Sequence, residues 1–223
     1  MPDLFNEARR LVGDAFLASP DRSCLTCSFQ AEDMVVLHIV RSFIPGVPVL
    51  FLETGYHFPE TLAYRDRMVR EWDLNLVNLT SPLAVEHHEA KFGILHKTEP
   101  SRCCNLRKVE PLMAGLEPFE VWFTGLRREQ SPTRANLQPE EFHRLPSGKV
   151  LRKVSPLAAW TWDDVIAYTE AKRIPLLPLY EQGYPSIGCA PCTQKPLDPL
   201  NPRSGRWAGQ KLECGIHTFT EQG

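Results

Sequence analysis

An apolar segment, a polar turn and a second apolar segment follow one another in SCLTCSFQAEDMVVLHIVRSF, residues 23–43. Residues 23–29 are apolar and rich in Cys and Thr, which predicts a short buried strand. Residues 34–43 form an apolar run that is too long for an average strand and predicts a buried helix. A strand that passes through a turn into a helix is the repeating unit of an α/β fold.

The same alternation continues through most of the chain. Further strands are predicted at the apolar runs 47–52, 74–79 and 120–124. Helices are predicted at residues 59–72, 83–92 and 102–116, the last interrupted at Pro111. A hairpin is expected at residues 142–154, and Thr161 is expected to open a helix with a capping-box spacing. We therefore expect a Rossmann-like, mostly parallel sheet with helices on both faces.

The last part of the chain has a different composition. Prolines crowd the sequence after Ile174, which predicts an irregular C-terminal segment. Little apolar content follows Pro202 to anchor the chain, so we expect a mobile tail there. The predicted organisation is a single domain, residues 1–223, with an α/β core at 1–174, a cysteine-bearing loop region at 175–202 and a tail at 203–223.

Polar motifs follow the predicted strands. Such motifs begin at Ser28 after the first strand, at Glu53 after the second and at Gly125 after the fourth. Ligands of open α/β sheets bind at the carboxyl ends of the strands. The loop at Ser28 precedes a helix, whose free N–H groups and dipole favour an anion, although an ordinary strand-to-helix turn is the alternative.

Two cysteine pairs stand far apart in the sequence. Cys103 and Cys104 are adjacent, and Cys189 and Cys192 form a CxxC motif. Thiolates are soft ligands that zinc and iron–sulfur clusters both select, so these four side chains predict a metal centre.

Two further cysteines also form a CxxC motif, and they admit more than one reading. Cys24 and Cys27 could complete a zinc site with the second pair, or act in redox chemistry. Their place in a predicted buried strand favours a structural role instead, because a buried free cysteine behaves as a small hydrophobe.

Composition narrows the class of protein. The chain has 223 residues, with 43% hydrophobic and 23% charged residues, as is ordinary for a globular protein. A formal charge of −2 argues against general nucleic-acid or membrane-surface binding. We see no apolar run of membrane-spanning length and no secretory signal, so we expect a cytoplasmic protein whose cysteines are ligands or catalysts.

The motifs taken together resemble those of the bacterial assimilatory adenylyl-sulfate reductases, the thioredoxin-dependent members of the PAPS/APS reductase family that hold a [4Fe–4S] cluster. The matching segments lie between Cys24 and His217 and occur in one order. They are SFxAED from Ser28, ETGYxFPET from Glu53, CCxxRKVEPL from Cys103, TGLRREQS from Thr124, CxxC from Cys189, RxGRW from Arg203 and ECGIH from Glu213.

The resemblance implies a fold and an activity. The fold would be that of the adenine-nucleotide α-hydrolases, with a modified phosphate loop. The activity would be reduction of adenosine 5′-phosphosulfate (APS) to sulfite and AMP by reduced thioredoxin, in sulfate assimilation. Cys214 would be the nucleophile and would pass through an S-sulfocysteine intermediate, with the [4Fe–4S] cluster on Cys103, Cys104, Cys189 and Cys192.

The resemblance also implies the substrate-binding residues. Lys108, Arg203 and Arg206 would surround the phosphosulfate with His217 nearby, and Ser28, Phe29 and Asp33 would form the phosphate loop. Leu52, Glu53 and Thr54 would contact adenosine, and Gly125, Arg127 and Arg128 would serve the nucleotide or the loop around it. One departure is Gln30, where the family usually has glycine, and which would either strain the loop or donate its amide.

Other functions stay open at this stage. A reductase for the 3′-phosphorylated nucleotide (PAPS), or for both nucleotides, is the nearest alternative, although such PAPS enzymes generally lack both cysteine pairs. An ATP pyrophosphatase of the same fold would carry a glycine-rich SGGxDS loop, which this sequence lacks. A non-enzymatic iron–sulfur or zinc sensor would give Cys214 no role. The sequence does not indicate the oligomeric state.

Overall fold

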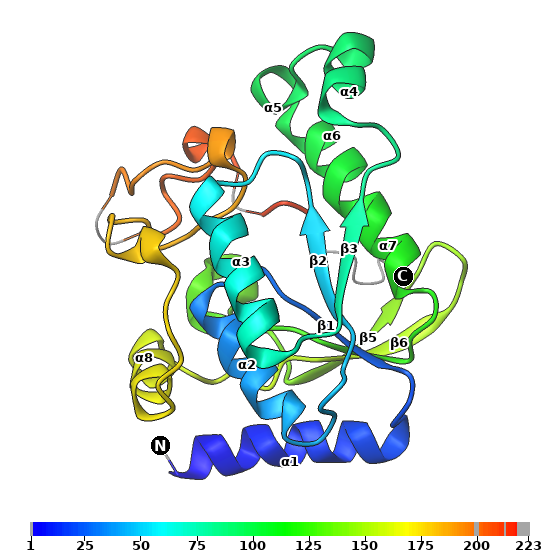
Figure 1. Cartoon of the computed structure of the whole chain (residues 1–223), viewed down its shortest axis with the longest axis vertical. Coiled ribbons are helices and arrows are strands. Elements are labelled where there is room, and N and C mark those ends of the chain that lie inside the picture. Colours follow the sequence, from blue (N-terminus) through cyan, green and yellow to red (C-terminus); the bar gives the residue numbers. More distant parts are fainter. Residues whose placement is uncertain (1, 199–200, 212, 218–223) are drawn as a thin grey trace.

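The structure is a computed structural model that describes residues 2–198, 201–211 and 213–217. A six-stranded sheet with the order β3-β2-β1-β4-β6-β5 forms its centre (Figure 1). Its strands are β1 (Ser23–Thr26), β2 (Val49–Glu53), β3 (Leu76–Thr80), β4 (Val121–Phe123), β5 (Glu140–Arg144) and β6 (Val150–Val154). All neighbouring pairs are parallel except β5–β6, which is the expected hairpin. The predicted α/β class is confirmed.

Alternate residues of the inner strands pack on opposite faces, because side chains of a strand point alternately to its two sides. Val49 and Phe51 of β2 belong to one buried cluster, whereas Leu50 belongs to the other. In β4, Phe123 and Trp122 are divided between the two clusters in the same way. The sheet is therefore buried on both sides, as its continuous apolar runs predict.

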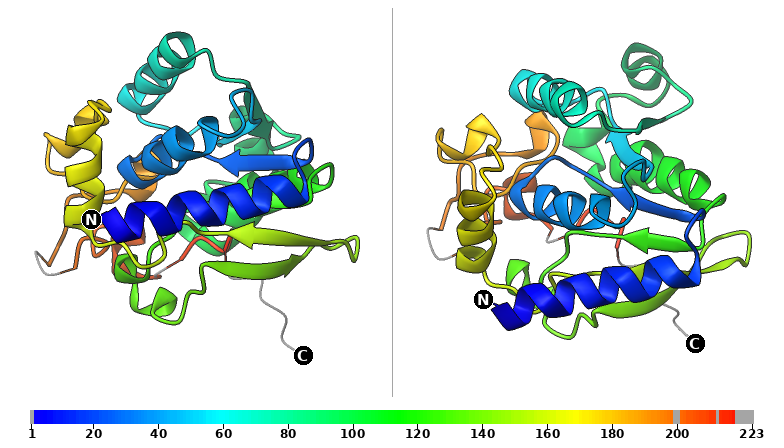
Figure 2. Two further views of the ribbon diagram at one scale, coloured as in Figure 1. Left: turned by 90° about the horizontal axis from the view of Figure 1, so that it is seen from below. Right: turned by 60° about the horizontal axis from the view of Figure 1, so that its bottom comes forward.

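Helices cover both faces. The larger cluster includes residues of α1 (Pro2–Ala18), α2 (Ala31–Arg41), α3 (Pro59–Trp72) and α8 (Trp162–Ala171). The smaller cluster includes residues of α7 (Glu110–Leu116). Figure 1 shows α3 and α7 on opposite sides of β2, and Figure 2 shows the long α1 beside α2. The helix α1 was not predicted from the sequence, although its buried residues Ala8, Leu11, Val12 and Ala15 have helical spacing.

The helix predicted at residues 102–116 is one run of turns with an irregular middle. It begins as α6 (Pro100–Cys104), widens into a π-helical turn (Asn105–Val109) and continues as α7. The irregularity thus precedes Pro111 and does not interrupt the helix there. A proline nitrogen has no hydrogen to donate, and the wider turn before it accommodates the missing bond.

The bounds of two predicted elements differ in the structure. The helix predicted at residues 83–92 is α4 (Val85–Phe92). His88 is 1% exposed and its ring packs on Phe92. The strand predicted at residues 23–29 ends at Thr26, because the chain turns at Phe29 (φ 61°).

The short helix α5 (Leu95–Thr98) completes the regular elements that Figure 1 labels. Thr161 opens α8 with the expected capping box, since its hydroxyl accepts from the Asp164 N–H and the Asp164 carboxylate accepts from the Thr161 N–H. None of the described helices combines the length and apolar content needed to cross a bilayer.

Candidate active site

A cavity of about 520 Å³ opens at the carboxyl ends of β1 and β4. These two strands are neighbours at the point where the strand order reverses, which is where open α/β sheets bind their ligands. Eleven of the fifteen predicted catalytic and substrate-binding residues line it: Ser28, Gln30, Asp33, Leu52, Lys108, Gly125, Arg127, Arg203, Arg206, Cys214 and His217. The other four, Phe29, Glu53, Thr54 and Arg128, do not.

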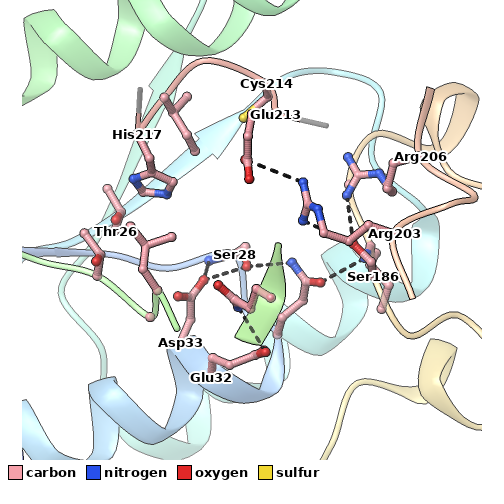
Figure 3. Close-up of a pocket in the computed structure, with 18 of the residues that line it drawn as sticks. Thr26, Ser28, Glu32, Asp33, Ser186, Arg203, Arg206, Glu213, Cys214 and His217 are labelled. Atoms are coloured by element: carbon pink, nitrogen blue, oxygen red, sulfur yellow. Dashed lines mark hydrogen bonds and ion pairs between the residues drawn. The ribbon is translucent and has the colours of Figure 1, made fainter. Parts of the chain in front are cut away.

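The loop between β1 and α2 forms the floor of this cavity (Figure 3). Its positive φ falls at Phe29, whose side chain is fully buried in the core rather than facing a ligand. The Ser28 N–H and hydroxyl both donate to Asp33 Oδ2, at 2.6 Å each. The buried Phe29 side chain therefore anchors the loop in the core, and the hydrogen bonds to Asp33 hold the conformation of the loop.

Asp33 also explains why a glycine follows β4. A Cβ atom at Gly125 would lie 2.3 Å from Asp33 Oδ1 and 2.9 Å from the Asp33 nitrogen, so a larger residue there would push the two loops apart. Burial raises the pKa of Asp33 to about 6, although hydrogen bonds from Ser28 and Gly125 oppose the rise. Gly125 thus serves close packing of the two loops.

Gln30 does not strain the loop, because its backbone is extended (φ −78°) and needs no glycine. Its amide nitrogen donates to Ser28 Oγ at 3.0 Å, and its amide oxygen accepts from the Ile187 N–H at 2.9 Å. Ile187 lies two residues before Cys189. Gln30 therefore bridges the loop between β1 and α2 and the segment that carries the second cysteine pair.

Two arginines from the C-terminal segment, the partly buried Arg203 and the buried Arg206, form one side of the cavity (Figure 3). Both approach Ser186 Oγ, Arg203 at 3.5 Å and Arg206 at 3.4 Å. Burial lowers the pKa of each, that of Arg203 to about 10, so both remain cationic near neutral pH. A Cβ atom at Gly188 would lie 2.0 Å from the Arg206 guanidinium, so this glycine makes room for that side chain.

Cys214 and His217 close the cavity from the other side, opposite Ser28 and Asp33 (Figure 3). The His217 ring stacks on Trp122, with ring centroids 5.5 Å apart and planes at 18°. Burial lowers the pKa of His217 well below its usual range, and the positive charges of Lys153 and Arg134 add to this. His217 is therefore neutral at physiological pH, and it fixes the tail near Cys214.

The described part of the tail is better anchored than its composition indicates. Trp207 is 5% exposed, and Ile216 packs on the smaller core cluster. Leu212 and residues 218–223, which belong to the predicted mobile tail, lie outside the described residues. Whether the tail moves stays a prediction.

The two arginines after β4 have protein partners. Arg127 is 4% exposed and pairs with Glu32 at 2.8 Å and Glu129 at 2.6 Å. The Arg128 side chain donates to the Leu137 carbonyl at 2.9 Å. Arg127 therefore holds the loop around the cavity, which is one of the two roles expected for it.

Of the three residues predicted at the end of β2 and just after it, one lines the large cavity and two do not. Leu52 lines it, whereas Glu53 pairs with Arg65 at 2.9 Å. Thr54 is fully buried, and its hydroxyl lies 3.4 Å from Cys189 Sγ. His57, which was not selected from the sequence, also lines the cavity, and its Nε2 lies 2.9 Å from the Leu52 carbonyl oxygen.

A second, small cavity contains all four predicted metal ligands. Its lining includes Cys103, Cys104, Cys189 and Cys192, together with Thr54, Tyr56, His96, Pro100, Arg107, Lys108 and Trp207. Burial, with a smaller contribution from the neighbouring sulfurs, raises the pKa of Cys103 to about 12 and that of Cys192 to about 11. Four thiolates placed this close together would repel one another, and a bound cation would offset that repulsion.

The arrangement of the thiols bears on which metal group fits. Within the described residues, no three Cys, His, Asp or Glu side chains gather closely enough for a single ion. A tetrahedral zinc site would bring its sulfurs to roughly 3.8 Å from one another, given Zn–S bonds of about 2.3 Å. A four-iron cluster is larger and spaces its cysteine ligands more widely. The four soft donors around one cavity therefore fit a cluster better than a single zinc ion.

Lys108 lines both cavities and connects them. Burial alone would favour the neutral amine, but the sulfurs of Cys189, Cys214 and Cys104 outweigh this and raise the pKa of Lys108. The π-helical turn places Lys108 there, one turn after Cys104. Lys108 thus lies between the four cysteines and the large cavity, and its role toward a substrate stays a prediction.

Cys24 and Cys27 are 0% and 2% exposed in β1 and just after it. Burial raises the pKa of both well above the usual range of a thiol. Neither lines the cavity of the four other cysteines. Their burial agrees with the structural role favoured from the sequence.

Comparison with known proteins places the chain in a family. The family described as phosphoadenosine phosphosulfate reductase domain matches residues 22–195, which include every element that builds the large cavity except the tail. The chain belongs to this family. Within the reductase family it is 46% identical over 199 residues to the adenosine 5′-phosphosulfate reductase of Streptomyces coelicolor, covering 88% of this chain and 82% of that protein. It is 44% identical over 198 residues to the enzyme of the same name from Rhodococcus opacus, covering 88% and 79%.

A solved structure agrees on the fold. The phosphoadenylyl-sulfate reductase of Candida auris, solved as a phosphate complex, superposes with a TM-score of 0.69 at 23% identity, covering 82% of this chain and 88% of that one. The reductase family and the sheet order thus agree with the expected Rossmann-like architecture.

Some residues of this reductase site were missed by the sequence analysis. Arg134 and Glu213 line the cavity and pair with each other at 2.7 Å, although 79 residues separate them. Glu32 and Gln130 line it as well and hydrogen-bond at 3.1 Å. Glu32 and Glu213 stand inside the quoted motifs, but a motif alone does not reveal which distant side chain each one meets.

Proposed function

We propose that this protein reduces adenosine 5′-phosphosulfate to sulfite and AMP through Cys214. The observation that carries the proposal is the placement of the Cys214 thiol in a cavity that Lys108, Arg203 and Arg206 also line. The names of the related bacterial enzymes support the choice of nucleotide. We assign the reaction to the cytoplasm, where free thiols persist.

The cations recognise the substrate and the loops orient it. Arginine and lysine bind phosphate and sulfate oxygens through charge-assisted hydrogen bonds and mask the negative charge that would repel a thiolate. The adenosine lies along Leu52 and the loop at Ser28, at the carboxyl ends of β2 and β1. Neutral His217 offers a hydrogen-bond partner without adding charge.

The chemistry proceeds in two steps. The Cys214 thiolate attacks the sulfonate sulfur, the bond from that sulfur to the phosphate oxygen breaks, and AMP leaves with the electron pair. A thioredoxin thiolate then attacks the Cys214 sulfur of the S-sulfocysteine, and sulfite leaves with the electron pair of the old sulfur–sulfur bond. The second thioredoxin thiol resolves the mixed disulfide, so that the dithiol is oxidised by two electrons and Cys214 is regenerated.

We propose that Cys103, Cys104, Cys189 and Cys192 hold a [4Fe–4S] cluster. When bound, the cluster supplies a charged, polarisable group next to Lys108. The electrons of the reaction come from the thioredoxin dithiol, and Lys108 connects the two cavities through its charge.

The test replaces Cys214 by serine. Sulfite release with reduced thioredoxin should disappear, and mass spectrometry should find no SO₃ adduct, while iron content and visible absorption stay at the wild-type level. Cys24→Ala is the control, because Cys24 lies outside both cavities, and it should keep turnover. Substantial sulfite release by the serine variant would contradict the proposal.

A parallel assay addresses the nucleotide. Turnover of the 3′-phosphorylated and unphosphorylated substrates by the same preparation separates an APS reductase from a PAPS or dual reductase. We expect the unphosphorylated nucleotide to be preferred by kcat/KM, in agreement with the names of the bacterial relatives.

A further inference from the structure

The carboxylate of Glu213, the residue before the proposed nucleophile, is held by several side chains. Arg134 donates from Nε to Oε1 at 2.9 Å and from Nη2 to Oε2 at 2.7 Å, which is a bidentate contact. The Thr133 hydroxyl donates to Oε1 at 3.1 Å, and Arg203 Nη2 lies 3.6 Å from Oε2. The paired side chains of Glu213 and Arg134 are 11% and 12% exposed.

The partner of Glu213 belongs to a turn that is hydrogen-bonded to the rest of the molecule. Arg134 ends a 3₁₀ turn (Pro132–Arg134) that Ser131 caps through the Thr133 N–H. Arg134 also donates to the Gln130 side chain, and Gln130 in turn donates to Glu32 of α2 at 3.1 Å. The contact therefore ties the tail to the loop after β4 and, through that loop, to the core.

The ionised state of Glu213 suits its contact with Arg134. Burial favours the protonated carboxyl, but hydrogen bonds and charge from Arg134 outweigh burial and lower the pKa of Glu213. A carboxylate that stays ionised and is held by a guanidinium has no proton to exchange near neutral pH. Glu213 is thus unsuited to acid or base catalysis and suited to holding the chain.

The contact between Glu213 and Arg134 holds the tail at the residue next to Cys214. Trp207 anchors the tail before Cys214, and Ile216 and His217 anchor it after Cys214 on apolar and aromatic surfaces. Glu213 gives the polar anchor immediately next to the thiol. Figure 3 shows its carboxylate pointing down into the cavity toward Arg203, with the Cys214 sulfur above.

We propose that Glu213 is a positioning residue whose contact with Arg134 holds the Cys214 sulfur over the substrate cavity. The inference rests on the proposed role of Cys214 as nucleophile. The contact to Arg203 is the longer of the two, so an incoming oxyanion competes with Glu213 for Arg203 while Arg134 keeps the tail in place. Loss of either Glu213 or Arg134 therefore releases Cys214 to solvent and slows its attack on the substrate.

A double-mutant cycle tests this with two readouts. Glu213→Ala, Arg134→Ala and the double variant are compared for the rate of SO₃ transfer to Cys214 in a single turnover. They are also compared for carbamidomethylation of Cys214 by iodoacetamide without nucleotide, followed by peptide mass mapping. We expect each single variant to slow SO₃ transfer about 20-fold and to speed alkylation by about as much, and the double variant to be no worse than either.

A matched pair controls for the loss of any Glu–Arg contact. Glu140 and Arg152 form a bidentate pair at 2.7 Å between β5 and β6, and neither residue lines a cavity described above. Alanine at either position should leave both readouts at the wild-type level. Arg134→Lys keeps the charge but loses the bidentate contact. The alkylation rate of Cys214 in this variant should therefore fall between those of wild type and Arg134→Ala.

The outcomes separate the two proposals. Unchanged alkylation of Cys214 in a folded Glu213→Ala or Arg134→Lys protein would overturn the positioning role, and so would additive effects in the cycle. Failure of the wild type to accept SO₃ would overturn the proposed function, while the alkylation cycle would still report on the tie. If a variant loses activity while its Cys214 is alkylated at the wild-type rate, Glu213 has only a structural role and the inference is rejected.

Discussion

Replacing Gln30 by alanine removes the bridge between the phosphate loop and the segment before Cys189. The variant loses the bond to Ser28 Oγ, worth about 1 kcal/mol, and leaves the Ile187 N–H without its acceptor, which costs about 1–3 kcal/mol more. Ile187 is 5% exposed, so water reaches its N–H poorly. We expect the free energy of unfolding to fall by about 3 kcal/mol.

Urea denaturation measures this loss. With a slope of about 2.5 kcal/mol per molar urea, the midpoint should fall by roughly 1 M. Gln30→Glu keeps an acceptor for Ile187 and should lose only about 1 kcal/mol. Gln138→Ala is the control, because Gln138 is exposed and its side chain donates to the nearby Asn136 carbonyl, and it should stay within about 0.5 kcal/mol of wild type. A loss below about 0.5 kcal/mol in Gln30→Ala would refute the bridge.

Three further predictions concern the same cavity. The pKa of Asp33 is raised from 3.8 to about 6, so its contribution to stability is full below pH 3.8 and is lost as the pH rises to about 6. Asp33→Asn should therefore gain up to about 3 kcal/mol relative to wild type over that range in urea titrations, and parallel curves would exclude the shift. Gly125→Ala places a Cβ 2.3 Å from Asp33 Oδ1 and should destabilise the protein by about 1–3 kcal/mol in the same assay, whereas Gly46→Ala, where an added Cβ meets no atom within 4 Å, is the comparison; equal losses at both sites would argue against close packing at Gly125. Lys108→Met should lower kcat/KM by about 100-fold because one cation of the anion site is gone, and wild-type kinetics in that variant would remove Lys108 from the site.

The regular elements near the site could be predicted because local pattern and burial agree there. Residues 59–72 carry a helical stripe and form α3 with the same bounds. The capping box at Thr161 is a local signal and was predicted correctly. The π-helical turn (Asn105–Val109) was not predicted, since a one-residue widening leaves no periodic signal in so short a segment. Its place immediately after Cys104 nevertheless sets where Lys108 points.

The partners of the charged residues could not be predicted. Arg127 and Arg128 look alike in the sequence, yet Arg127 is buried against Glu32 and Arg128 binds the Leu137 carbonyl. Glu53, expected to contact adenosine, turns to Arg65. Which cation remains available to a substrate depends on carboxylates brought near it by the fold, and sequence spacing carries no record of them.

Sequence alone determined the α/β class, the reductase motifs and the identity of the cysteines, because hydrophobic periodicity and short-range residue chemistry are written along the chain. Tertiary structure alone decided that β1 and β4 become neighbours, that Gln30 meets Ile187 and that Glu213 meets Arg134 across 79 residues. Those contacts depend on strand order and on the return of the tail over the sheet. Both follow from burying two apolar faces at once, which is a property of the whole chain rather than of any segment.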